Sequence, residues 1–194
     1  GRDRMTTTAP ARRPRRDAQR NRAAILDAAR AAFAEAGLEA PMDAIAKSAG
    51  IGAGTLYRHF PTRDDLVAAV LEDHRVDLDE RARELTEQGL DPAESLERWL
   101  DSLEDWMTAY DGLPEPLRAA QSGTCSPLRS TCATAIDRTE DFLDAARRAG
   151  AVRDGVGAED LFFAALGLAW AAEQSEGGHA ATLRVLLREG WQKR

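Results

Sequence analysis

The sequence predicts an all-α protein. Apolar residues recur at helical spacing along most of the chain, as where Ile25, Ala29 and Phe33 follow one another at intervals of four. Glycines and prolines separate these stretches, and none of them shows the period-two alternation that marks a strand. We therefore expect about nine helices joined by short links.

Start and stop signals divide the first half of the chain into four helices. Gly37 ends the first apolar run, and Pro41 stands near the first turn of the second helix. Pro61 stops the third helix, while Thr62 is a suitable N-cap for the fourth, which Gly89 ends. The expected ranges are about 16–36, 42–48, 53–60 and 63–88, with residues 77–87 mostly solvated.

Five further helices are expected in the second half. The fifth begins at Pro92, and a segment broken by Gly112, Pro114 and Pro116 contains a short sixth helix. Gly150 ends a long seventh helix, and two more helices complete the chain. The expected ranges are about 92–110, 117–121, 127–149, 158–175 and 178–192.

Residues 44–63 carry the most informative pattern of the chain. Ile45 and Ala49 share one helix face, and Gly50 follows where the backbone needs a residue that tolerates positive φ. Leu56 and Phe60, again four residues apart, face inward from the next helix. Agreement at several positions in so short a window predicts a DNA-reading helix-turn-helix rather than two ordinary packed helices.

The second helix of this pair has a polar outer face suited to nucleic acid. Gly54 has no side chain, so the backbone can approach a groove closely. The hydroxyl groups of Thr55 and Tyr57 can bind phosphate oxygens or base edges, and Arg58 adds a charged donor. Lys47 and Arg63 are expected to reach phosphates. The predicted DNA-binding set is therefore Lys47, Gly54, Thr55, Tyr57, Arg58, His59 and Arg63.

The same stretch resembles the N-terminal domain of TetR-type (tetracycline-repressor-like) regulators. In that family a first helix ends near F-x-x-x-G, and I-A-x-x-A-G-(I/V) and G-x-L-Y-x-H-F follow. The resemblance covers roughly residues 20–70. The matching residues are Phe33, Gly37, Ile45, Ala46, Ala49, Gly50, Ile51, Gly54, Leu56, Tyr57, His59, Phe60 and Leu66.

Two positions depart from the family pattern. Gly52 stands where a serine often caps the reading helix, so backbone or water must provide that cap. Thr62 and Arg63 replace the usual Ser/Thr-Lys pair, which keeps the positive charge. Neither change alters the assignment.

Charge is distributed unevenly along the 194 residues. Residues 1–63 carry 12 Lys and Arg against 6 Asp and Glu, a net charge of +6, whereas the remainder carries 14 against 27, a net charge of −13. A basic head on an acidic body fits phosphate binding at one end. We expect a disordered basic arm at 1–16, a DNA-binding domain at 17–63, and a ligand-binding and dimerisation domain at 64–194. The arm either touches DNA or is a plain solvated tail.

Residues 161–172 predict a dimer interface. This run is uncharged and apolar on every face, yet too short to span a membrane. A second copy of the chain is the simplest partner for its outer side, and the alternative is a central core helix in a monomer. The resemblance also implies dimerisation through the last two long helices. The expected interface residues are Leu161, Phe162, Gly167, Leu168, Ala171, Leu183, Leu186 and Leu187.

An aromatic stripe in the fifth helix predicts the wall of a ligand cavity. Such a stripe is more often simple core, but two Trp, a Met and a Tyr on one face exceed what filling requires. The resemblance implies a cavity among the fifth to eighth helices, for a small apolar or aromatic effector. The expected lining residues are Trp99, Leu103, Trp106, Met107, Tyr110, Phe163, Leu166 and Trp170.

The sequence gives no sign of an enzyme, a cofactor, a metal site or a membrane segment. It has no nucleophile elbow, phosphate loop or dinucleotide motif, and its three histidines lack metal-ligand spacing. It also lacks a signal-peptide pattern, and we expect Cys125 and Cys132 to be reduced thiols in a cytoplasmic protein.

These observations predict a ligand-responsive transcriptional regulator, most consistent with a repressor, that binds a palindromic double-stranded DNA operator as a homodimer. In one alternative, the chain binds DNA without any small-molecule effector, and its larger domain serves only dimerisation or protein contacts. In another, it is a helical enzyme or carrier that has lost DNA binding, which the intact reading helix argues against.

Overall fold

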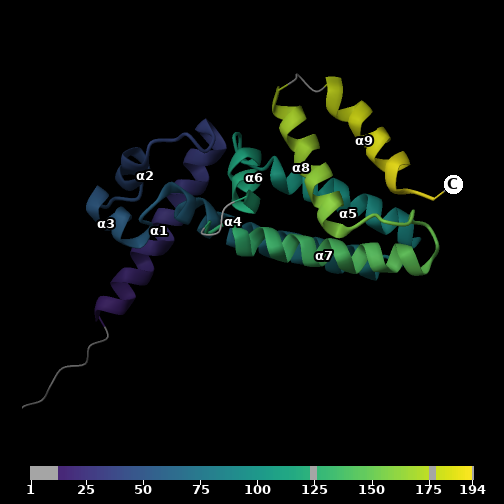
Figure 1. The fold of residues 1–194 in the computed structure, drawn as a ribbon. Coiled ribbons are helices and arrows are strands. Elements are labelled where there is room, and N and C mark those ends of the chain that lie inside the picture. The colour runs from purple at the N-terminus through teal and green to yellow at the C-terminus, as the bar shows by residue number, and fades with distance from the viewer. Residues whose placement is uncertain (1–12, 123–125, 175–177, 194) are drawn as a thin grey trace, which may run out of the picture.

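The computed structural model describes the backbone of residues 13–122, 126–174 and 178–193, and their side chains except at 13–15, 73–77 and 178. Within these ranges all regular secondary structure is helical, apart from a single antiparallel bridge between Val152 and Gln192. Figure 1 shows α1 to α3 at one end of the molecule and α5 to α9 at the other. The helices are α1 (Arg13–Ala36), α2 (Met42–Ser48), α3 (Ala53–His59), α4 (Arg63–Glu87), α5 (Pro92–Met107), α6 (Pro114–Ser122), α7 (Arg129–Arg148), α8 (Ala158–Gln174) and α9 (Gly178–Trp191).

The all-α class and the order of the helices are confirmed. Two helices are longer than expected: α1 already begins at Arg13, and α6 begins at Pro114 rather than at 117. A proline is tolerated in the first turn of a helix, where its missing N–H has no partner to lose. Most of the expected basic arm, residues 1–12, lies outside the described residues.

Helix α4 belongs to both ends of the molecule. Thr62 caps it as expected: its hydroxyl accepts from the Asp65 N–H at 3.1 Å, and the Asp65 carboxylate accepts from the Thr62 N–H at 2.9 Å. Its first half buries Leu66 and Val70 in the small N-terminal core. Its second half was expected to be mostly solvated, but it buries one face against α5 and α7, with Leu78, Ala82 and Leu85 buried.

Helix α5 is the centre of the larger domain. Its apolar side chains recur at three- and four-residue intervals, and it packs against α4, α7 and α8. At its N-terminal end the Asp91 carboxylate caps the Ala93 N–H at 2.9 Å. The core of this domain is therefore built around one face of a single amphipathic helix.

A second contact, besides α4, joins the two ends. The Leu38 N–H, in the α1–α2 link, donates to the Asp111 carbonyl oxygen at 2.9 Å. Beside it the Phe33 and Tyr110 rings meet edge to face, with centroids 5.9 Å apart. The small domain is thus fixed to the α5–α6 turn as well as to α4.

Helix α8 holds the same turn from the other side. The Gly112 N–H donates to the Glu173 carboxylate at 2.9 Å. Burial raises the pKa of Glu173, and the Gly112 hydrogen bond opposes that shift. The α5–α6 turn therefore lies between the small domain and α8.

Charged pairs dock α9. Arg184 donates to both carboxylate oxygens of the buried Glu104 on α5, at 2.7 Å each, and Arg188 pairs with Glu97. The outer face of α9 therefore remains available to another surface. No helix in the described part of the chain combines the length and apolar character needed to cross a membrane.

Alanine substitutions at two glycines test the contact between the α1–α2 link and the α5–α6 turn. Gly37 and Gly50 both have positive φ, +67° and +70°, so alanine at either position introduces backbone strain of about 1–2 kcal/mol. A Cβ at Gly37 would also lie 2.9 Å from the Asp111 carbonyl oxygen, whereas one at Gly50 would meet nothing within 4 Å. We expect Gly37→Ala to lower the free energy of unfolding by about 1–3 kcal/mol more than Gly50→Ala.

Urea denaturation at one fixed protein concentration measures this difference. Equal losses for the two variants would contradict the described contact between Gly37 and the α5–α6 turn.

Candidate nucleic-acid interface

The α2–α3 pair has the geometry of a helix-turn-helix. Gly50 adopts the left-handed conformation that the turn requires, and its N–H donates to the Lys47 carbonyl oxygen at 3.1 Å. The Ile51 N–H then donates to the Ala46 carbonyl oxygen at 3.1 Å, and the Ile51 side chain packs on the core. These bonds close α2 and fix the start of α3.

The inner and outer faces of α3 are divided as expected. Leu56 and Phe60 are buried in the small domain, whereas the Tyr57 side chain is 46 % exposed. Arg58 and Gly54 are exposed, and Thr55 and His59 are half-buried. A Cβ at Gly54 would meet nothing within 4 Å, so the backbone is open there. This arrangement presents a tyrosine, an arginine and open backbone on one surface.

Arg58 and Thr55 form a pair on that surface. The Arg58 guanidinium donates to the Thr55 hydroxyl oxygen at 3.0 Å and to the Gly54 carbonyl oxygen at 3.2 Å. The Thr55 hydroxyl oxygen therefore accepts from Arg58 within the chain, and its O–H can still donate to an acceptor on a bound molecule. Such a pair is suited to a phosphate oxygen or a base-edge acceptor.

Arg22 of α1 adds a positive charge that the sequence pattern did not indicate. Its guanidinium lies over the Phe60 ring, 5.5 Å from the ring centroid, and its side chain is exposed. The two residues are far apart in the sequence, so only the packing of α1 on the end of α3 reveals the contact. Lys47 on α2 is exposed as well.

Comparison with known proteins supports this reading. Residues 25–70 match the tetR family of bacterial regulatory proteins, and residues 91–190 match the C-terminal domain of SbtR-like transcriptional regulators. The second match alone covers more than half of the chain. The chain belongs to the TetR family.

Relatives agree with this assignment to the TetR family. An HTH-type transcriptional regulator of Staphylococcus aureus (strain USA300) is 48 % identical over 59 residues, which are 30 % of this chain and 32 % of that protein. The chain thus matches only about a third of the length of its curated relatives. The TetR transcriptional regulator SCO0520 from Streptomyces coelicolor is 33 % identical, with a TM-score of 0.59, and the match covers 88 % of this chain and 98 % of that one.

A structure described as the molecular basis for control of antibiotic production by bacterial hormones is also similar. It is 25 % identical to this chain, with a TM-score of 0.53, and the match covers 89 % of this chain and 97 % of that one. The similarity to SCO0520 and to this structure extends across both domains of the TetR fold.

Arg63 lies apart from the exposed face of α3. Its guanidinium donates to the Leu38 carbonyl oxygen and, at 2.7 Å, to the Ala40 carbonyl oxygen. We predicted that it reaches a phosphate, but in the structure its charge is used to hold the α1–α2 link. Local spacing could not reveal this role, because the two carbonyl groups lie on a link more than 20 residues earlier.

The two faces of α8 agree only in part with the sequence-based expectation. Leu161, Phe162 and Leu168, expected at a dimer interface, are buried inside the chain, whereas Phe163 and Trp170, expected in a cavity wall, are 43 % and 54 % exposed. Because this TetR helix is apolar all round, its sequence carries no periodic signal to distinguish the faces. The remaining expected interface residues are exposed or half-buried: Gly167, Ala171, Leu183, Leu186 and Leu187.

The expected ligand wall on α5 is part of the core. Trp99 stacks on Phe142 with centroids 5.0 Å apart and donates to the Thr139 hydroxyl at 3.0 Å, so one end of the stripe is filled. Leu103, Trp106 and Met107 of α5 are buried, as are Tyr110, just after α5, and Leu166 of α8. Cys132 is buried with its thiol reduced, and Cys125 lies outside the described residues.

Arg63 and Lys47 form a matched pair for testing the interface. Replacing Arg63 with alanine leaves two carbonyl oxygens without their donor, so we expect the free energy of unfolding to fall by about 1–3 kcal/mol. Lys47→Ala removes an exposed charge, so we expect stability to change by less than about 0.5 kcal/mol. For Lys47→Ala, the slope of log affinity for DNA against log salt should fall by about one.

Urea denaturation and DNA titrations at several salt concentrations measure both effects. A full phosphate contribution from Arg63, seen as a lower salt slope without loss of stability, would overturn its assignment to the α1–α2 link.

Proposed function

We propose that this TetR-family chain is a transcriptional repressor that binds a palindromic operator as a homodimer. The observation that carries the proposal is the exposed face of α3, where Tyr57, Arg58 and open backbone at Gly54 lie together. The net charge of +6 that the sequence gives to residues 1–63 favours phosphate binding by this part of the chain. A DNA-binding role also implies a cytoplasmic location.

The outer apolar face of α8 and α9 supports dimerisation. Trp170 and Phe163 of α8 are exposed, as are Leu186, Val185 and Leu183 of α9, at 59 %, 52 % and 37 %. Large apolar side chains gathered on adjacent helices mark an interaction surface. A two-fold pair of chains would place two α3 helices on successive major-groove faces, about 34–36 Å apart or a little more.

An effector that binds the larger domain would release the operator by stabilising a mismatched spacing of the two α3 helices. The similar structure concerned with control by bacterial hormones supports a small-molecule signal. In the second candidate function, the larger domain serves only dimerisation or protein contacts. The filled space around Trp99 favours that alternative.

Selection of genomic fragments by the purified protein provides the operator for the decisive test. On that operator we expect Tyr57→Ala to weaken binding by about 10-fold or more, because each good base-edge or backbone contact is worth about 1–3 kcal/mol. Since Tyr57 is exposed, the melting temperature should stay nearly constant. Electrophoretic mobility shift titrations measure the affinity.

Arg98→Ala provides the control, because Arg98 is an exposed residue of α5 far from α3 in the sequence. An unchanged affinity of Tyr57→Ala, or an equal loss for Arg98→Ala, would count against the proposed interface.

The dimer is tested by placing a charge on its proposed surface. We expect Trp170→Glu to convert the protein to a monomer and to weaken operator binding, because a carboxylate cannot be buried unpaired at an apolar interface. Ser130→Glu, at an exposed position of α7, should leave the dimer intact. Sedimentation velocity measures the mass. A stable dimer of Trp170→Glu would refute this interface.

A further inference from the structure

Among the described residues of the larger domain, two side-chain hydrogen-bond donors are buried without partners. They are the indole N–H of Trp106, on α5, and the side-chain amide N–H₂ of Gln121, on α6. The Trp106 side chain is only 6 % exposed. Buried donors in native proteins almost always have an acceptor, so each exception calls for an explanation such as an absent water or ligand.

Trp99, on the same helix, provides an internal comparison. Its ring is completely buried and its indole N–H donates to the Thr139 hydroxyl at 3.0 Å. The described part of the fold thus supplies an acceptor for the Trp99 N–H and none for the Trp106 N–H, about two helical turns further along α5. The difference points to an acceptor that comes from outside the chain.

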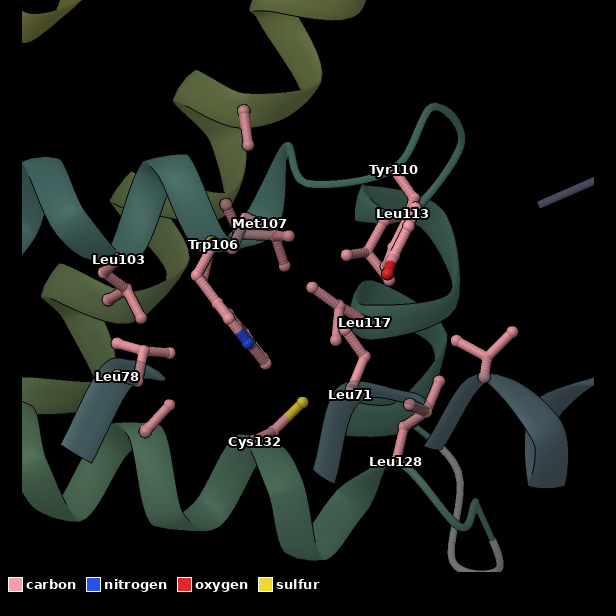
Figure 2. Packing of buried hydrophobic residues seen from close by; sticks show 14 of the residues in the cluster. Leu71, Leu78, Leu103, Trp106, Met107, Tyr110, Leu113, Leu117, Leu128 and Cys132 are labelled. Atoms are coloured by element: carbon pink, nitrogen blue, oxygen red, sulfur yellow. The ribbon is translucent and has the colours of Figure 1, made fainter. Parts of the chain in front are cut away.

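The two donors converge beside Cys132. Figure 2 shows the Trp106 side chain extending from α5 toward Cys132 on α7, between Leu78 on one side and Leu117 on the other. The Gln121 side chain also lies beside this thiol: burial raises the pKa of Cys132, and a hydrogen bond from the Gln121 side chain opposes the shift. A thiol sulfur is only a weak acceptor, so the Gln121 amide still has no strong partner. The buried side chains that Figure 2 draws around Trp106 and Cys132 are apolar, namely Leu71, Leu78, Leu103, Met107, Leu117 and Leu128. The void beside Trp106 also reaches Thr131, Thr134 and the Asp79–Arg138 ion pair.

Leu78 and Trp106 also separate two spaces. On their outer side an open groove of about 640 Å³ runs between α4 and α5, with Arg81, Ser102 and Asp105 along it. On their inner side a small void of about 10 Å³ reaches Thr131 and Ala135 of α7. That void holds at most one water, so a ligand must displace the two side chains from the groove side.

We propose that Trp106 and Gln121 anchor a neutral, mainly apolar effector through its acceptor oxygens. The chemical class is a compact molecule with a carbonyl group, such as a ketone, ester or lactone. Both anchors are uncharged donors, so the ligand must accept. Arg138, which borders the void, is already paired with Asp79 and Asp141, so a buried carboxylate would lack a free cationic partner. This inference rests on the proposed function and names the kind of signal that the repressor detects.

The position of this site connects it to the DNA-binding end. Leu71 and Leu78 lie on α4, whose first turns belong to the core of the small domain. A ligand that separates Leu78 from Trp106 moves α4 against α5. The effector therefore acts on the helix that carries the reading domain.

Acetophenone and ethylbenzene are matched probes for this site, because they have similar size and differ in the carbonyl acceptor. We expect the purified wild-type protein to bind acetophenone about 3- to 10-fold more tightly, which is the effect of one or two neutral hydrogen bonds. In Trp106→Phe and Gln121→Met the preference should fall to within about 2-fold, because each variant removes a donor; Gln121→Met does so at nearly constant size, and Trp106→Phe keeps an aromatic ring. Isothermal titration calorimetry measures both affinities.

A stability measurement without any ligand tests the same donors. Gln121→Met deletes an amide that has no strong partner at nearly constant size, so its melting temperature should stay constant or rise. Trp106→Phe and Trp99→Phe both remove part of a buried ring and leave a similar cavity. Trp99→Phe additionally leaves the Thr139 hydroxyl without its donor, so it should lower the melting temperature by roughly 2–4 °C more than Trp106→Phe does. A comparable fall for Trp106→Phe would show that its N–H is already satisfied and would overturn the proposal.

Equal affinity of the wild type for both probes, or no binding of either, would also overturn the proposed effector site. The Trp106 and Gln121 donors would then bind a water molecule only. Operator binding is measured separately on the same samples. Failure to bind any genomic fragment would defeat the proposed repressor, whereas intact operator binding without discrimination between the probes would defeat only this effector site.

Discussion

The structure depends on one unbroken helix, α4, whose two halves are buried against different helices: α1 on one side, and α5 and α7 on the other. Helix α4 starts beneath the reading helix, where Leu66 and Val70 fill the small domain, and continues until Leu85 is enclosed by the larger one. Because a helix is stiff over 25 residues, its two halves cannot be reoriented independently. The Leu38–Asp111 hydrogen bond adds a second fixed point, so the orientation of α3 follows that of the larger domain.

This constraint links the proposed dimer to DNA recognition. Glu173 of α8 holds the α5–α6 turn through the Gly112 N–H, and the same turn holds the α1–α2 link. Arg63 closes the connection by binding the Leu38 and Ala40 carbonyl groups from the start of α4. A change in how α8 packs against its partner would therefore be transmitted to the reading domain through hydrogen-bonded backbone as well as through α4.

Sequence reasoning succeeded where the determining interactions are local. The turn at Gly50, the buried Leu56, the exposed Tyr57 and the cap at Thr62 are all set by neighbours within a few residues. Sequence reasoning failed where contacts between residues far apart in the sequence determine which side chains are buried or bonded. The face of α8 that carries Trp170 could not be chosen from an all-apolar run, and the carbonyl partners of Arg63 are not encoded nearby. The unpartnered Trp106 N–H is likewise a property of the assembled core, because its twin Trp99 looks the same in the sequence.

The central claim is that two copies of α3 read one DNA site together. Hydroxyl-radical footprinting on a selected operator, with the protein-to-DNA ratio measured in the same complex, tests it most directly. The account predicts protection at two places on one face of the duplex, about one helical turn apart or slightly more, with two chains bound per site. A single protected patch with one chain bound, or binding that does not weaken as salt rises, would contradict it.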